Sequence, residues 1–207
     1  MTMNVDYCKD VLKRYKEEGI CIELKQGSLV PITYDFEDSM PECAALLSKW
    51  RIENPSLSPA EFVVTEKRTT AWIEKAILNN PNRILFMIKD DNQRYVGHIG
   101  ISNIDPTKGK ARLDSVMRGE TTTCKTIMRD SIETLVHWCS TNFGVTRIDL
   151  VVLSDNERAI RLYRNCGFVS DGILPLKKIQ ENGEINWIED ATIKKPEKSY
   201  LHMEYIL

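Results

Sequence analysis

The six residues from Ile148 to Leu153 (IDLVVL) are almost all apolar, and an amphipathic segment lies on either side of them. Such a continuous apolar run is typical of a strand that is covered on both faces. Before it, Cys124–Asn142 places apolar residues every three to four positions and is closed by Gly144, which predicts a helix. After it, Glu157–Cys166 predicts a second helix that ends at Gly167. We therefore expect a mixed α/β layer structure.

Toward the N-terminus, charged amphipathic stretches flank one β-branched stretch, and extended segments follow. The amphipathic stretches predict helices, and the β-branched or alternating stretches predict strands. The composition of Asp90–Gln93 predicts a hairpin between two of these strands. We expect helices at Asp6–Glu18, Pro41–Arg51 and Glu66–Leu78, and strands at Gly27–Phe36, Arg83–Lys89, Arg94–Ile104, Ala111–Met117, Phe168–Ile179, Ile185–Ile188 and Tyr200–Leu207.

Capping residues mark two of the expected helix starts. Asp38 and Ser39 precede the helix expected from Pro41. Ser154 and Glu157 have the Ser-x-x-Glu spacing of a capping box. In a capping box the side chain of each residue accepts a hydrogen bond from the backbone N–H of the other. We therefore expect Ser154 to cap the helix that begins at Glu157.

The length and charge of the chain limit its organisation and its partners. Its 207 residues suit one domain, and neither a repeat nor a linker divides them. We expect residues 1–26 to form an N-terminal helical extension and residues 27–207 to form the domain itself. With 28 basic and 30 acidic residues, the chain lacks the field that would attract nucleic acid or a membrane. Because the N-terminus has no apolar signal core, we expect a cytoplasmic protein.

The cysteines and histidines give no sign of a metal site. The six cysteines show neither CxxC nor CxH spacing, and the three histidines are widely separated. Several of the cysteines fall in apolar stripes, where a free thiol acts as a small hydrophobic group. We therefore expect reduced, structural thiols and no bound metal.

The stretch Ser154–Phe168 (SDNERAIRLYRNCGF) carries the most specific pattern in the chain. Its apolar residues share one helix face, and a face of this kind is most often simply core. The fixed spacing goes further, because it resembles the pattern Asn-x-x-Ala-x-x-Leu-Tyr-x-x-x-Gly-Phe of the GNAT superfamily of acetyl-CoA-dependent N-acyltransferases. The matching residues are Asn156, Ala159, Leu162, Tyr163, Gly167 and Phe168.

The N-terminal half is similar to the branch of this superfamily that acetylates ribosomal-protein N-termini and amino sugars. The resemblance implies a single-domain α/β fold, whose mixed sheet holds two splayed parallel strands, Ala111–Met117 and Ile148–Leu153, flanked by helices. It also implies that the pantetheine arm of acetyl-CoA lies between these strands, with its pyrophosphate at the N-terminus of the helix that follows the first strand. The residues that carry the similarity in this half are Trp50-Arg51 with Asn54-Pro55, and Thr65 with Trp72.

The expected pyrophosphate loop departs from the superfamily pattern. The usual loop is Arg/Gln-x-x-Gly-x-Gly/Ala, whereas this chain has the run Arg118-Gly119-Glu120-Thr121-Thr122-Thr123. Glycine allows the backbone to approach phosphate closely, and β-branched threonine does so poorly. A second alignment starts the helix near Cys124-Lys125 and leaves a longer loop, in which threonine hydroxyls and the cations Arg118, Lys125 and Arg129 act as donors. One alternative is a polar connection with a capping threonine and no ligand, in a degenerate, non-catalytic member of the superfamily. Another is a CoA-binding or interaction module without catalysis.

The resemblance assigns Tyr163 as the general acid that protonates the departing thiolate, since a phenol keeps its proton at neutral pH. It assigns Asn156 to acetyl-CoA binding, and backbone N–H groups near Val116 and Met117 to the oxyanion. The plainer alternatives are packing for Tyr163 and a helix N-cap for Asn156. The residues expected to contact acetyl-CoA are Val116, Met117, Arg118, Gly119, Thr122, Thr123, Cys124, Lys125, Asn156, Ala159 and Tyr163.

The base and the acceptor are less sharply defined. Asp114 is expected to be the base or to anchor the amine, with Glu120, His98 or a water relay as alternatives for the base. The plainer alternative for Asp114 is an ion pair with a nearby cation. The acceptor is expected in the N-terminal half and beside residues 174–187. Aromatic and cationic groups together suit an amino sugar linked to a nucleotide, and a protein N-terminus is the alternative acceptor. A homodimer is compatible with the sequence. The residues expected to bind the acceptor are Trp50, Arg51, Trp72 and His98, with Phe62 beside them; the alternative for the tryptophans is ordinary core packing.

Overall fold

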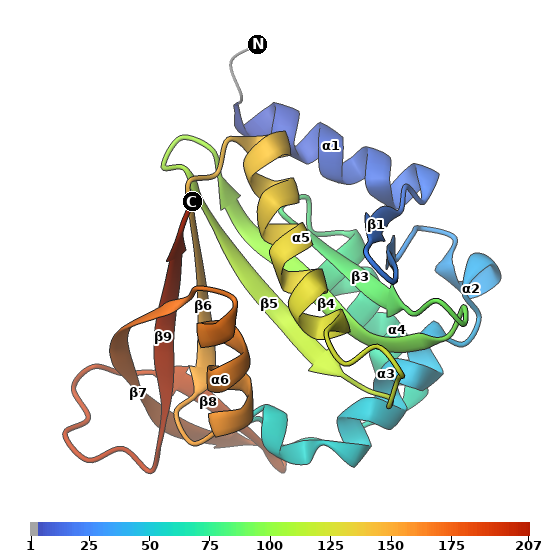
Figure 1. Cartoon of the computed structure of the whole chain (residues 1–207). Helices are drawn as coiled ribbons and strands as arrows, with labels where there is room; N and C mark the ends of the chain where they lie inside the picture. The colour runs from blue at the N-terminus through green and yellow to red at the C-terminus, as the bar shows by residue number, and fades with distance from the viewer. Residues whose placement is uncertain (1–3) are drawn as a thin grey trace.

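The computed structural model describes residues 4–207, which form one mixed sheet with helices on both faces (Figure 1). The parallel pair is β5 with β6, and the other neighbouring strands are antiparallel. The expected mixed sheet is thus confirmed. In spatial order the strands are β1 (Ile22–Leu24), β2 (Gly27–Pro31), β3 (Arg83–Lys89), β4 (Tyr95–Asp105), β5 (Lys110–Arg118), β6 (Arg147–Leu153), β9 (Lys198–Ile206), β7 (Val169–Glu181) and β8 (Glu184–Glu189).

Helices of two groups cover the two faces of this sheet. On the face toward the viewer in Figure 1 lie α1 (Val5–Glu18), α5 (Ile127–Phe143) and α6 (Glu157–Asn165). Alternate residues of β3 face the two sides: Phe86 belongs to the core cluster under α1 and α5, and Leu85 belongs to the cluster on the opposite side. The second cluster is closed by α2 (Phe36–Ser39), α3 (Cys43–Glu53) and the π-helix η2 (Ile73–Leu78). A short 3₁₀ turn η1 (Pro55–Leu57) follows α3, and α4 (Glu66–Trp72) packs on α3 without a buried residue of its own.

Several local expectations are wrong at element ends. The strand expected to run to Phe36 ends at Pro31, and a short turn leads into α2, which contains the residues expected to cap the next helix. Strand β1, which pairs with β2, was not expected. Helix α6 is capped by Asn156, whose side-chain oxygen accepts from the backbone N–H of Ala159 at 3.1 Å, and not by Ser154. The Asn156 side chain satisfies the free N–H three residues on, that of Ala159, whereas a capping box from Ser154 would have used the N–H of Glu157.

Strand β5 leaves its parallel partner after a few residues, and this opens the sheet. Pairing between β5 and β6 is confined to residues 110–112 and 147–149. Farther along β5, Asp114 lies opposite Gly100 and Met117 lies opposite His98, so β5 carries one extra residue there. This β-bulge includes Ser115, whose φ of 49° lies in the left-handed region that residues other than glycine rarely adopt. The two diverging strands confirm the splayed pair that the resemblance implies.

Candidate functional site

A pocket of about 780 Å³ occupies the gap where β5 and β6 diverge. Strands β4, β5 and β6, helix α6 and the segment after α3 contribute to its walls. Most of the residues that sequence analysis assigned to a site meet here, although they come from segments far apart in the chain. The predicted residues that line the pocket are Arg51, Trp72, His98, Asp114, Val116, Met117, Arg118, Lys125, Asn156, Ala159 and Tyr163. The predicted residues outside its lining are Trp50, Gly119, Thr122, Thr123 and Cys124.

Tyr163 lies in the pocket wall on the inner face of α6. Its ring packs edge to face on Phe168, with centroids 6.0 Å apart, and the residue is only 7% exposed. Within residues 4–207 its hydroxyl makes no hydrogen bond, and it is not among the enclosed unpaired atoms. Burial raises the pKa of this phenol above its ordinary value, so the hydroxyl remains a proton donor at neutral pH.

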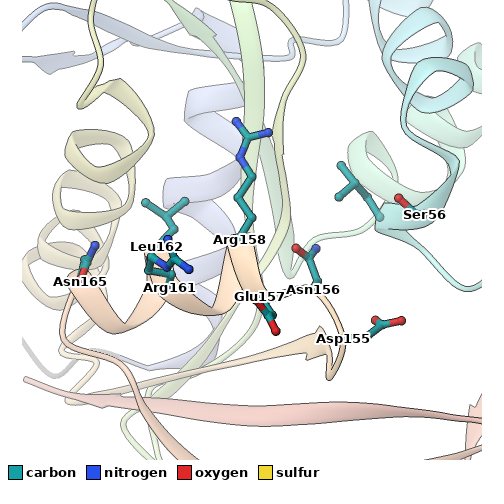
Figure 2. Close-up of a pocket in the computed structure, with 9 residues that line it drawn as sticks. Ser56, Asp155, Asn156, Glu157, Arg158, Arg161, Leu162 and Asn165 are labelled. Carbon is teal, nitrogen blue, oxygen red and sulfur yellow. The ribbon is translucent and has the colours of Figure 1, made fainter.

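The first turn of α6 lies between the large pocket and a second one. Figure 2 shows this second pocket, of about 700 Å³, with the residues of α6 on one side and Ser56 on the other. Asn156 and Arg158 line both pockets. Since the Asn156 side-chain oxygen is used as the helix cap, its NH₂ group is the part left to bind a ligand.

Cations gather where β5 ends and α5 begins. Arg118, Lys125 and Arg129 line the pocket there, and Arg129 is paired with Glu133 at 2.7 Å. Helix α5 begins at Ile127, after a loop that is longer than the usual motif, as the second alignment expects. The free N–H groups and the positive dipole of a helix start attract an anion. A diphosphate therefore fits this end of the pocket.

His98 lines the pocket from β4, where it lies opposite Met117 of β5. Its Nδ1 lies 2.6 Å from the carbonyl oxygen of Ser115, which only accepts, so Nδ1 carries the proton. The ring stacks on Trp50 with centroids 6.1 Å apart. Burial lowers the pKa of His98 to about 4, although the bond to Ser115 opposes this shift. At neutral pH, Nε2 is thus a hydrogen-bond acceptor.

Asp114 forms a half-buried ion pair at the bulge in β5. Its Oδ2 lies 3.2 Å from Nε of Arg83, while its Oδ1 is enclosed and has no hydrogen-bond partner among residues 4–207. Arg83 also donates to the Ser115 hydroxyl at 3.0 Å and lies over the ring of Trp72. Because one oxygen of Asp114 already faces the Arg83 guanidinium, the residue is better suited to a charge-pairing role with an ammonium group than to proton transfer.

Glu120, another alternative for the base, is already paired, and so is the neighbouring Trp50. Glu120 is held by Lys49 at 2.6 Å and by the indole N–H of Trp50 at 3.0 Å, and these hydrogen bonds lower the pKa of its carboxyl group. Its charge is already used outside the pocket lining. Trp50 is fully buried, and its ring covers Gly119, where a Cβ atom would lie 2.1 Å from the indole. Trp50 thus acts in packing.

Aromatic rings and arginines surround the acceptor end of the pocket. Phe62 is 40% exposed and lies between the guanidinium groups of Arg51 and Arg68, at 5.6 and 5.2 Å from its centroid. Arg51 is held by the carbonyl oxygens of three loop residues, and burial lowers its pKa. Arg68 pairs with Glu184 of β8 at 2.7 Å. Next to this pair, Glu61 and Ile185 exchange two backbone hydrogen bonds, at 2.8 and 2.9 Å.

Sequence analysis missed four charged residues of this site and the bulge. Arg68, Arg83, Arg158 and Glu184 are brought to the pocket or its ion pairs by tertiary contacts between distant segments. Arg158 alone had a signal, because it follows Asn156 within the recognised motif. The bulge at Ser115 had none, since no glycine marks it. Among residues 4–207, no group of three or more His, Cys, Asp or Glu side chains is placed to hold a metal, and no described helix is long and apolar enough to cross a membrane.

Comparison with known proteins gives one family and many related folds. Residues 46–168 match the sequence model of the acetyltransferase (GNAT) family. No curated protein matches the chain in sequence. The chain resembles the structure of the ribosomal α-N-protein acetyltransferase RimL with coenzyme A, at 14% identity and a TM-score of 0.64, over 91% of this chain and 98% of that one. The microcin self-immunity acetyltransferase MccE with acetyl-CoA and AMP has 17% identity and a TM-score of 0.66, over 88% and 93%. Spermidine N-acetyltransferase from Vibrio cholerae with CoA and spermine has 16% identity and a TM-score of 0.59, over 87% and 94%.

Proposed function

We propose that this chain, which belongs to the acetyltransferase (GNAT) family, passes the acetyl group of acetyl-CoA to the amine of an amino sugar linked to a nucleotide. The family makes the chain an acetyl-CoA-dependent N-acyltransferase, and the acceptor is the proposed part. Acetyl-CoA supplies the activated acyl group as a thioester. The splayed strands, the unpaired phenol of Tyr163 and the cations at the start of α5 fit this cosubstrate.

The acceptor end of the pocket carries the proposal. The rings of Phe62 and Trp72 are 40% and 37% exposed there, and an exposed aromatic face suits a sugar or a nucleobase. Three guanidinium groups lie at this end, those of Arg51, Arg68 and Arg83. Two of them are paired with a carboxylate, Arg68 with Glu184 and Arg83 with Asp114. The net charge of these groups is positive, so it favours an acceptor that carries phosphate over a polycation such as a polyamine.

The chain's own residues have distinct roles in this proposal. Asp114, which lines the pocket, anchors the acceptor ammonium, and Nε2 of His98 accepts a second N–H of the same group. Water in the pocket takes the proton that the ammonium must lose, because Asp114 is already paired with Arg83 and His98, with its lowered pKa, is a weak base. Backbone N–H groups at the bulge, near Val116 and Met117, hold the oxyanion. The hydroxyl of Tyr163 holds the proton that the leaving sulfur needs.

The test is a comparison of acceptors with acetyl-CoA as donor. We expect release of free thiol with aminodeoxy sugars linked to a nucleoside diphosphate, and a kcat/KM about tenfold to a hundredfold lower for the same sugars without the nucleotide. This range corresponds to the loss of roughly one charge-assisted hydrogen bond. Spermidine is expected to be a poor acceptor.

The variant Arg68→Gln separates recognition of phosphate from catalysis. It is expected to raise KM for the nucleotide-linked sugar and to leave KM for the free amino sugar unchanged. Preferential acetylation of peptide N-termini, followed by intact mass, would contradict the sugar acceptor and favour a protein substrate. If the free and the nucleotide-linked sugars react equally well, the proposed role of the arginines is wrong.

A further inference from the structure

The loop between β5 and α5 is fastened to the protein from outside the pocket. The backbone N–H groups of Gly119 and Glu120 both donate to the carbonyl oxygen of Val96, at 2.9 and 3.0 Å. Farther along, the hydroxyl of Thr122 donates to Oδ2 of Asp90 at 3.1 Å. Asp90 lies in the β3–β4 turn, so the loop is tied to a turn whose residues, 90–94, take no part in the pocket lining.

Asp90 is a fixed acceptor that is ionised at neutral pH. Its side chain is 1% exposed, and its Oδ1 accepts from the backbone N–H groups of Asn92 and Arg94, at 3.0 and 3.1 Å. Its Oδ2 accepts from Nη2 of Arg94 at 2.9 Å as well as from Thr122. Burial opposes ionisation, but the hydrogen bonds from Arg94 and Thr122 outweigh it and lower the pKa of Asp90. The carboxylate therefore holds the Thr122 hydroxyl at neutral pH.

The hydroxyl of Thr122 also orders the chain that leads into α5. It accepts from the backbone N–H of Cys124 at 3.3 Å while it donates to Asp90. The Thr122 hydroxyl thus links the buried Asp90 carboxylate to the backbone of Cys124. Lys125, which lines the pocket, and the first turn of α5 come directly after this point. A β-branched side chain has few rotamers, so this link is stiff.

We propose that Asp90 and Thr122 are a positioning pair that holds residues 119–126 in the conformation that binds the pyrophosphate of acetyl-CoA. This inference rests on the proposed use of the loop as the pyrophosphate site. The pair does the work that two glycines do in the usual motif: the loop is shaped by a bond on its outer side, and it does not need a flexible backbone. Neither side chain lines the pocket, so the pair acts through the loop and not by contact with the ligand.

The experiment uses the full chain and two acyl donors. Thr122→Val removes the hydroxyl at constant shape, and Thr122→Ser keeps it. S-acetylpantetheine has the same thioester as acetyl-CoA but lacks the pyrophosphate. We expect Thr122→Val to bind CoA about tenfold more weakly in calorimetry and to raise KM for acetyl-CoA to a similar extent, with kcat unchanged. Thr122→Ser is expected to stay within about twofold of the wild type, and kcat/KM with S-acetylpantetheine is expected to be the same for all three proteins.

A matched control and a second variant make the outcomes distinct. Thr192 donates to Asp190 at 2.6 Å in an exposed turn, so Thr192→Val breaks the same kind of bond elsewhere and is expected to change neither donor's kinetics. Asp90→Asn weakens the pair from the other side and is expected to follow Thr122→Val. Wild-type affinity for CoA in Thr122→Val, or an equal loss with both donors, would overturn the inference. Failure of the wild type itself to bind CoA would overturn the proposed function instead.

Discussion

At the scale of single residues, Tyr163 has the environment of a proton donor, and a matched tyrosine exists to test it. Tyr163→Phe should lower kcat by roughly a hundredfold and leave CoA affinity within about twofold, because the hydroxyl acts on the leaving sulfur and not in binding. Tyr205 packs on the same Phe168 ring, at 5.4 Å, but lies outside the pocket lining. Tyr205→Phe should therefore keep normal turnover. An unchanged kcat in Tyr163→Phe would remove this residue from the chemistry.

The buried ring of His98 should make stability depend on pH. Its pKa is about 4 in the folded chain, against an ordinary value of 6.5. As the pH falls from 6.5 to 4, the unfolded chain takes up a proton that the folded chain does not, so the free energy of unfolding decreases over this window, by at most roughly 3 kcal/mol. In His98→Gln this part of the dependence should be absent, while the exposed His137→Gln should keep it. Urea unfolding at several pH values measures both, and parallel curves for His98→Gln and the wild type would contradict the assignment.

At the scale of elements, the buried Lys16 of α1 holds this helix to the end of η2. Its Nζ donates to the carbonyl oxygens of Ile77 at 2.8 Å, Leu78 at 3.3 Å and Asn80 at 2.7 Å, where η2 ends. Burial lowers the pKa of Lys16 to about 8, so the ammonium is the main form at neutral pH. These three bonds satisfy carbonyl groups that a helix end leaves free.

Lys16→Met keeps the aliphatic stem and removes the three donors. Because buried carbonyl groups then lose their partner, we expect a decrease in the free energy of unfolding of roughly 2–4 kcal/mol in denaturant titration. Lys13 lies on the exposed side of the same helix, paired with Glu17 at 3.5 Å, and Lys13→Met should change stability by less than about 0.5 kcal/mol. Equal effects of the two substitutions would show that the buried bonds add nothing.

Elements with a strong period were predictable, and their ends were less so. The apolar runs of β3 and β6 and the periodic stripe of α5 appear where the sequence predicts them, because burial decides them. The cap of α6 was assigned to Ser154 because its spacing is that of a capping box, yet the neighbouring Asn156 makes the bond. Local patterns allow several caps, and the final backbone geometry selects one. Strand β1 has only three residues, too few for a period.

The site was predictable where a motif spans contiguous residues, and also along β5 and at three positions of the N-terminal half, where the resemblance assigned residues that line the pocket. Asn156, Ala159 and Tyr163 share one helix and line the pocket together. The resemblance of the N-terminal half assigned Trp50 to the acceptor, but the structure buries this ring against His98 and against Gly119 of the β5–α5 loop. The ion pair between Arg83 and Asp114 joins two different strands through packing that no local pattern records. The catalytic and binding roles themselves stay predictions for the experiments above.

At the scale of the whole molecule, the sheet is two parts joined by a narrow parallel contact. The pairing of β5 with β6 stops after residues 112 and 149, and the pocket begins beyond that point. Across the acceptor end, the parts meet again through the Glu61–Ile185 bridge and the Arg68–Glu184 pair. Motions that separate the two parts should therefore expose the backbone N–H groups of β5 and β6 that face each other. The strand pairs within each part should open only later.

A ligand that fills the gap should suppress this opening. With CoA at a hundred times its Kd, the closed form gains about 2.7 kcal/mol, so hydrogen exchange at residues 113–118 and 150–153 should slow by about a hundredfold. Amides of Ile22–Leu24, at the sheet edge, should be unaffected, because they exchange by local fraying. Exchange measured with and without CoA tests this, and S-acetylpantetheine should protect the same strands with no added protection at the start of α5. Uniform protection across the chain, or protection confined to the edge, would show that the ligand does not lie between the diverging strands.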